Sequence, residues 1–174
     1  MRKILVAISG ASGVTLGKKF MEKLPDSLEK YLILSDNAKI VFEKEENITI
    51  LNNKDISEVS SSGSFMIDTM AIIPCSMNTL AKISCGIADN LITRSASVMI
   101  KERRKLLLAP REMPFSPIAL ENMIKLSQIG VIISPPILGY YSDIKSLEEM
   151  EDFLIGKWFD SLEIEHNLFK RWGE

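Results

Sequence analysis

The stretch "RKILVAISGASGVTLGKKFMEKL", residues 2–24, combines three kinds of local structure in succession. The run after its basic pair is apolar and β-prone, which is typical of a strand buried on both faces. The turn "SGASG" follows, and apolar residues then recur at helical spacing at Val14, Phe20, Met21 and Leu24. The stretch therefore predicts a buried strand, a tight glycine turn and an amphipathic helix, the first unit of an α/β fold.

The same alternation continues along the rest of the chain. We expect strands at 31–34, 70–74, 105–110 and 130–136, and helices at 36–46, 78–84, 89–104, 116–129 and 146–162, with an irregular polar segment at 47–65. Strands that alternate with helices predict a mostly parallel sheet with helices on both faces. Because no linker or repeat divides the sequence, we expect a single domain over residues 1–174.

Composition narrows the function classes. The 174 residues are 46% hydrophobic and 25% charged, which suits one well-packed core, and the net charge of −2 argues against general nucleic-acid binding. No apolar run reaches the length of a membrane span, so we expect a soluble, cytoplasmic protein without a membrane partner. Cys75 and Cys85 fit no zinc or redox spacing, and His166 is the only histidine. No metal-ligand spacing is present, so we expect no metal site.

The glycine turn could bind an anion. Gly10 and Gly13 would let the backbone approach a ligand, and the helix that follows would offer free amide groups. The motif is not the full dinucleotide fingerprint, and Ser35 stands where a ribose-binding acid would be expected, so an NAD site is disfavoured. A tight turn without any ligand fits the same residues.

Polar residues also follow the third expected strand. Ser76 and Thr79, with the amides of Met77 and Asn78, could hold a phosphate at a helix start or could simply cap that helix. Since ligands in open parallel sheets bind beyond the carboxyl ends of the strands, this position favours binding.

A basic block ends at the next strand. Its six cations are Arg94, Lys101, Arg103, Arg104, Lys105 and Arg111. Some of them fit a solvated helix end, but Arg111 and Glu112 directly follow the strand at 105–110. A cation beside a carboxylate at that edge indicates phosphate binding and proton transfer, or else a local ion pair. Two prolines would stiffen the later loop "PPILGYYSD" and hold Tyr140 and Tyr141 in a definite direction, where they could close an apolar pocket and donate to an anion.

Taken together, these segments resemble the flavin prenyltransferases, the flavoprotein partners of reversible aromatic-acid decarboxylases in the ubiquinone pathway. The matching segments are "GASG" (10–13), Ser35, "SSGSF" (61–65), "IIPCSMNTLAKISCGIADNL" (72–91), "RSASVMIKERRKLLLAPRE" (94–112), "PFSPIALENM" (114–123) and "RW" (171–172). They occur in order from the first strand to the C-terminal residues.

The resemblance implies a Rossmann-like, flavodoxin-type fold that binds FMN. It also implies transfer of the dimethylallyl group of dimethylallyl monophosphate to N5 and then C6 of reduced FMN. The prenylated FMN would pass to a UbiD-type decarboxylase. Members of this family form homo-oligomers, typically dodecamers, with FMN at subunit contacts.

The family pattern also implies roles for particular residues. FMN would contact Gly10, Ala11, Ser12, Ser35, Ser76, Met77, Asn78, Thr79 and Arg111. The substrate phosphate would be surrounded by Lys101, Arg111, Tyr141 and Lys157, with Arg94 as a further candidate, and Trp172 would close the site. The catalytic group would comprise Glu112 for proton transfer, Ser12 near the flavin N5, and Lys101.

Two positions depart from that pattern. Lys157 stands in place of an arginine and loses its bidentate geometry, and Asn78 stands in place of a lysine. Two other functions remain as alternatives. A flavin-dependent decarboxylase of cysteinyl substrates would use a histidine early in the chain, and a non-enzymatic FMN carrier would need only the FMN contacts.

Overall fold

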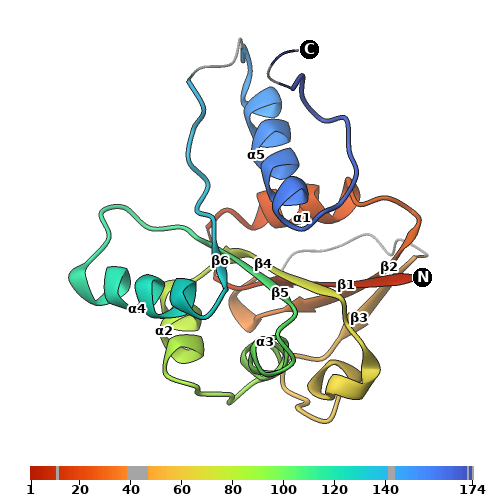
Figure 1. Cartoon of the computed structure of the whole chain (residues 1–174), viewed down its shortest axis with the longest axis vertical. Coiled ribbons are helices and arrows are strands. Elements are labelled where there is room, and N and C mark those ends of the chain that lie inside the picture. Colours follow the sequence, from red (N-terminus) through yellow and green to blue (C-terminus); the bar gives the residue numbers. More distant parts are fainter. Residues whose placement is uncertain (11, 39–46, 141–143, 172, 174) are drawn as a thin grey trace.

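The computed structural model describes residues 1–10, 12–38, 47–140, 144–171 and 173 (Figure 1). Six strands form one parallel sheet in the order β3-β2-β1-β4-β5-β6. The strands are β1 (Arg2–Ile8), β2 (Leu28–Leu34), β3 (Ile48–Leu51), β4 (Thr69–Cys75), β5 (Lys105–Pro110) and β6 (Ile132–Ile133). This order is that of a Rossmann-like α/β fold, the class that the resemblance implies.

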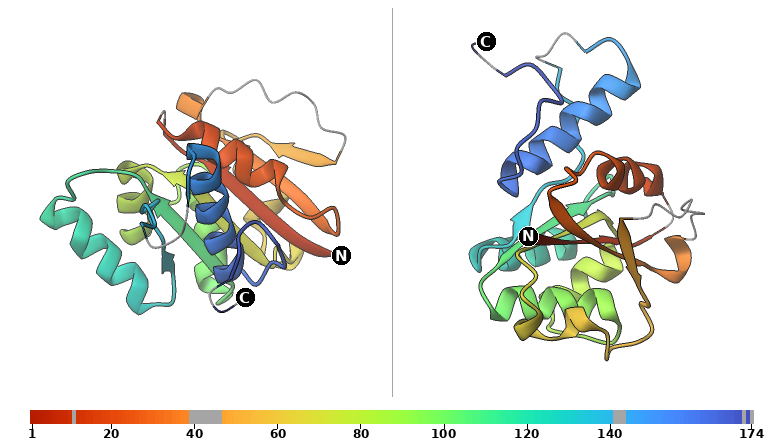
Figure 2. Two further views of the ribbon diagram at one scale, coloured as in Figure 1. Left: turned by 90° about the horizontal axis from the view of Figure 1, so that it is seen from above. Right: turned by 90° about the vertical axis from the view of Figure 1, so that its right-hand side faces the viewer.

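Helices cover both faces of the sheet (Figures 1 and 2). In the described residues they are α1 (Val14–Glu22), α2 (Met77–Ser84), α3 (Leu91–Lys101), α4 (Pro117–Gln128) and α5 (Leu147–Ser161), with short 3₁₀ helices at Asp36–Ala38, Val59–Ser61 and Gly63–Phe65. Side chains of a strand point alternately to its two faces. Thus Leu5 of β1 packs with α2, α3 and α4, whereas Ile4 packs with α1 and α5.

The strand order determines where a ligand can reach the sheet. The chain passes from β1 outward to β2 and β3, and then returns to add β4 on the other side of β1. The connections after β1 and β4 therefore diverge to opposite faces of the sheet. They leave a crevice at the carboxyl ends of these strands, where open α/β sheets bind ligands.

The sequence prediction is wrong at one strand and imprecise at two elements. β3 lies inside the segment expected to be irregular. It is a four-residue edge strand in which only Leu51 is buried, so its apolar signal is weak. The last expected strand is limited to the two residues of β6. Of the helix expected at 36–46, residues 36–38 form a 3₁₀ turn and 39–46 lie outside the described residues. Within the described part of the chain, no helix is both long and apolar enough to cross a bilayer.

Candidate active site

The glycine turn lies at the carboxyl end of β1. Gly10 and Gly13 have φ values of +103° and +82°, in the left-handed region that glycine adopts without strain. The Gly10 amide donates a hydrogen bond to Ser35 Oγ (3.3 Å), which connects the turn to the end of β2. Gly13 is the N-cap of α1, so the amide groups at the start of this helix lie beside the turn.

The second component is the start of α2, directly after β4. Ser76 Oγ accepts a hydrogen bond from the Thr79 amide (3.2 Å) and lies 3.0 Å from Thr79 Oγ1, so the predicted helix cap is present. The Ser76 amide donates to Ser9 Oγ (3.0 Å), a buried group at the end of β1. This hydrogen bond joins the ends of β1 and β4, so the first turns of α1 and α2 lie close to each other.

The third component follows β5. The Arg111 amide donates to the Cys75 carbonyl (3.4 Å), which keeps this segment paired with the end of β4. The Glu112 carboxylate accepts a hydrogen bond from the Met113 amide (3.1 Å). Both Arg111 and Glu112 are exposed, so their charged groups are available to a ligand.

Two cavities meet at Arg111 and Glu112. The first, here called the turn cavity, measures about 160 Å³ and is lined by Ser9, Gly10, Ser12, Pro74, Cys75, Ser76, Met77, Arg111 and Glu112. The second, here called the loop cavity, measures about 620 Å³ and is lined by Pro110, Arg111, Glu112, Met113, Pro114, Phe115, Pro135, Pro136, Ile137, Leu138 and Tyr140. A polar recess thus adjoins a larger and mainly apolar one, with a cation and a carboxylate between them.

Most of the residues expected to contact FMN lie at the turn cavity. Gly10, Ser12, Ser76, Met77 and Arg111 line it. Ser35 lies next to this group through its bond to Gly10, and the Thr79 hydroxyl is turned toward the helix cap. Asn78 is exposed in the first turn of α2.

Three predicted residues fall outside the described part of the chain. They are Ala11, Tyr141 and Trp172. Tyr140, the neighbour of Tyr141, lines the loop cavity. The predicted roles of the three residues stay predictions.

These two cavities do not bring together all the cations expected around the substrate phosphate. Arg94, Lys101 and Lys157 are described, and none of them lines the turn cavity or the loop cavity. The direction of α3 explains why Lys101 does not line these cavities. A helix that connects two parallel strands starts at the carboxyl edge of the sheet and runs back to the amino edge. Lys101 is its last residue, about 15 Å along the helix from its start, where it pairs with the exposed carboxylate of Glu102.

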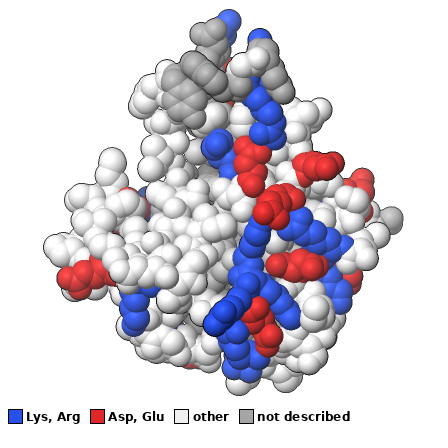
Figure 3. Space-filling model, viewed as in Figure 1, with Lys and Arg blue, Asp and Glu red and all other residues white. Residues whose placement is uncertain are grey.

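The charged side chains are also unevenly distributed over the surface. Lys and Arg side chains, mixed with acidic ones, form a band on one side of the molecule, while the surface over α4 and β6 is largely uncharged (Figure 3). Pairs such as Lys105 with Glu163 belong to the amino edge of the sheet, opposite the glycine turn. Most of the basic block therefore does not belong to the turn cavity, and Arg111 is the member that does.

Cys75 lines the turn cavity, but its thiol is not a nucleophile. Burial raises the pKa of this thiol to about 12, despite hydrogen bonding from the Leu80 amide and Ser9 that lowers the pKa. The reactive form of a cysteine is the thiolate, which is scarce at neutral pH with such a pKa. Among the described residues no group of three His, Cys, Asp or Glu side chains could hold a metal ion.

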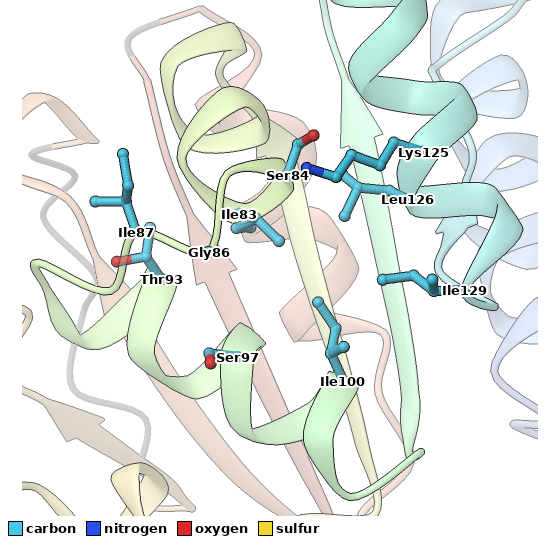
Figure 4. Close-up of a pocket in the computed structure, with 10 residues that line it drawn as sticks. All are labelled: Ile83, Ser84, Gly86, Ile87, Thr93, Ser97, Ile100, Lys125, Leu126 and Ile129. Atoms are coloured by element: carbon cyan, nitrogen blue, oxygen red, sulfur yellow. The ribbon is translucent and has the colours of Figure 1, made fainter.

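A third cavity lies between helices on one face of the sheet (Figure 4). It measures about 250 Å³ and is lined by Ile83, Ser84, Gly86, Ile87, Thr93, Ser97, Ile100, Lys125, Leu126 and Ile129. Lys125 extends toward Ser84 across it (Figure 4). It contains none of the predicted site residues, so we do not include it in the candidate active site.

Sequence reasoning missed two parts of the site. The sequence pattern places Ser9 only in the turn "SGASG", although its position between a buried strand and two glycines indicates a residue of the site. The apolar wall of the loop cavity was also missed, including Met113, Phe115 and Leu138. The proline pairs of the two loops were the available signal, because rigid loops after neighbouring strands can enclose a recess.

Comparison with known proteins agrees with this geometry. The Flavoprotein family model matches residues 1–158. The flavin prenyltransferase UbiX of Helicobacter pylori (strain 26695) is 50% identical, over 98% of each chain. The chain belongs to the flavoprotein family, among the flavin prenyltransferases.

Two solved structures resemble this flavin prenyltransferase closely. One is AnUbiX (PadA1) in complex with FMN and dimethylallyl pyrophosphate, with a TM-score of 0.93 and 36% identity, covering 99% of this chain and 98% of that one. The other is a dodecameric FMN-dependent UbiX-like decarboxylase from Escherichia coli O157:H7, with a TM-score of 0.91 and 36% identity, covering 99% and 100%.

Proposed function

We propose that this chain transfers the dimethylallyl group of dimethylallyl monophosphate to N5 and C6 of reduced FMN. The observation that carries the proposal is the meeting of the turn cavity and the loop cavity at Arg111 and Glu112. The similar AnUbiX, which is in complex with FMN and dimethylallyl pyrophosphate, supports this pairing of a flavin with a dimethylallyl ester.

The residues of the turn cavity fit a flavin nucleotide. The left-handed backbone at Gly10 lets the chain approach a flat ring, and a Cβ there would lie 3.3 Å from Ser76 Cβ. In the first turn of α2, the amides of Met77 and Asn78 have no carbonyl partner within the helix and can donate to an anionic or carbonyl oxygen. We assign FMN to this cavity, with Ser12 beside the reacting edge of the ring.

The loop cavity fits the prenyl group. Its prolines, Ile137 and Leu138 offer an apolar wall that matches a five-carbon branched chain and excludes water. We assign Arg111 to the ester oxygen, because its guanidinium can take up charge as the carbon–oxygen bond breaks and the phosphate departs.

Glu112 is assigned to proton transfer. Each new carbon bond, at N5 and at C6, replaces a proton on the reduced flavin, and a base must accept that proton. At N5, the released proton can go to the departing phosphate, which becomes inorganic phosphate. At C6, the double bond of the transferred group must gain a proton as C6 loses one, and the Glu112 carboxyl group can carry that proton from C6 to the prenyl chain. The flavin supplies the electron pairs for both bonds, so no external oxidant or reductant is needed.

We assign Lys101 and Arg94 to the site of a neighbouring copy. Both are exposed on α3, and Lys101 lies at the edge of the sheet away from its own turn cavity. The dodecameric relative supports an oligomer in which one chain presents these cations to the site of another. In that arrangement, Lys101 and Arg94 of one chain are assigned to the substrate phosphate of another. Tyr141 and Lys157 are assigned to the phosphate in their own chain, and Trp172 to closure of the site. The product would pass to a UbiD-type decarboxylase in the cytoplasm.

The test is the mass of the flavin after reaction. Purified protein is mixed anaerobically with reduced FMN and dimethylallyl monophosphate, and the extracted flavin should gain one five-carbon unit. Unchanged FMN at full occupancy would refute the transferase and indicate an FMN carrier. Release of carbon dioxide from a cysteinyl peptide would instead indicate the decarboxylase reading.

A further inference from the structure

The last part of the chain lies along α5. We call residues 163–171 the tail. The ring centroid of Phe169 lies 5.1 Å from that of Phe153 and 5.3 Å from that of His166. These rings rest on Gly156, where a Cβ would come within 2.4 Å of the Phe169 ring and 2.8 Å of His166. The absence of a side chain at Gly156 is what lets the tail approach the helix this closely.

Asp160 of α5 holds the tail through two further residues. Its Oδ1 accepts a hydrogen bond from Arg171 (2.9 Å) and lies 3.1 Å from His166 Nε2. His166 Nδ1 accepts from the Leu168 amide (3.2 Å), so the neutral ring carries its proton on Nε2 and donates it to Asp160. The other carboxylate oxygen, Oδ2, lies 3.9 Å from Lys157 Nζ.

This arrangement is connected to the loop cavity. A Cβ on Gly139 would lie 2.8 Å from the Phe153 ring, so the loop that contains Ile137, Leu138 and Tyr140 packs on α5 beside the tail. Lys157 lies one helical turn after Phe153. Figure 2 shows α5 and the tail projecting together from the sheet beyond α1.

We propose that Asp160 is a positioning residue for the prenyl substrate, because it fastens the tail to α5 and so fixes Lys157 and the end of the tail relative to the loop cavity. The proposal rests on the proposed function. Asp160 acts through these residues and does not itself contact the substrate. It holds Arg171 and His166 with one oxygen and leaves Lys157 only a long contact with the other, so Lys157 can turn to a phosphate without breaking the attachment of the tail.

The ionisation of Asp160 agrees with this role. Burial raises the pKa of its carboxyl, but hydrogen bonds from Arg171 and His166 outweigh burial and leave the pKa below its ordinary value. The carboxylate is therefore charged at neutral pH, as an attachment through Arg171 requires.

The test uses three variants of the full-length protein. Asp160→Asn weakens the attachment, and Gly156→Ala displaces the Phe169 ring without changing any charge. Glu165→Gln is the matched control, because it removes one negative charge from an exposed position of the tail. Two quantities are measured in each: deuterium exchange of the tail amides, and KM and kcat for dimethylallyl monophosphate with saturating reduced FMN.

We expect Asp160→Asn and Gly156→Ala each to speed deuterium exchange of the tail amides. Each should also raise the KM for dimethylallyl monophosphate by about tenfold, the effect of one lost charge-assisted hydrogen bond. The kcat and the affinity for FMN should change by less than about twofold. The double variant should show no further increase, since both changes act on the same contact. Glu165→Gln should match the wild type in both measurements.

Failure of this proposal differs from failure of the proposed function. A wild-type protein that leaves FMN unprenylated refutes the function. A wild type that prenylates FMN, with KM unchanged in Asp160→Asn, refutes the role of Asp160. A rise in KM without faster exchange of the tail refutes it equally, because the change would then act through charge alone.

Discussion

Replacing Ser76 by Ala should reduce both stability and FMN affinity, whereas replacing Ser116 should reduce stability alone. Both serines follow a strand and cap a helix, with Oγ accepting an amide hydrogen bond of 3.2 Å from Thr79 or Ala119. Ser76 lines the turn cavity and Ser116 does not. The pair therefore separates helix capping from ligand binding.

Each substitution removes one helix cap, worth about 1 kcal/mol of unfolding free energy. Ser76→Ala also loses the contact with the Thr79 hydroxyl, so a loss of about 1–2 kcal/mol is expected there. If Ser76 in addition donates to FMN, the affinity for FMN falls by about fivefold to tenfold.

Urea unfolding without FMN measures the first effect, and titration of flavin fluorescence measures the second. The reasoning would be refuted by equal losses of FMN affinity in the two variants. An unchanged affinity in Ser76→Ala would also refute it, because the hydroxyl would then serve only the helix.

Three other outcomes are expected. Glu112→Gln should leave FMN affinity within about twofold but slow prenylation by about a hundredfold, as measured by single-turnover flavin mass, since general acid–base groups contribute such factors; equal losses of both would contradict its role. Iodoacetamide at pH 8 should label exposed Cys85 in the native protein and spare Cys75, whose pKa is about 12; intact mass would show one adduct, and rapid labelling of Cys75 would disprove its burial. Wild type should be more stable than Asp160→Asn above pH 3.8, the ordinary pKa of an aspartate, and this difference should shrink as the pH falls further, because the pKa of Asp160 in the folded protein lies below that value. Urea unfolding at several pH values measures the difference. A difference that does not shrink in acid would contradict the prediction.

The central part of the fold could be predicted from the sequence because its signals are local. The apolar run of β1, the glycines after it and the capping residues Ser76 and Ser116 each act within a few neighbours. The edge strand β3 could not be predicted in this way, because its pairing with β2 is what makes it a strand.

The site was predictable to the extent that it lies at the ends of strands. Ser12, Ser76 and Arg111 each follow a strand of one parallel sheet, so their convergence follows from topology. The position of Lys101 depends on the length of α3, which starts at the carboxyl edge of the sheet and runs away from it. Motif matching along the chain could not show that, within one copy, Lys101 does not line the cavities that Arg111 lines.

The shared wall between the two cavities has a thermodynamic consequence. Because Arg111 and Glu112 line both cavities, the ligand that binds first changes the charge and the side-chain orientation of these two residues for the ligand that binds second. Linkage requires that the flavin change the dissociation constant of the phosphate ester by the same factor as the ester changes that of the flavin. Two binding titrations, run in opposite orders, would therefore give one coupling constant for this pair of side chains.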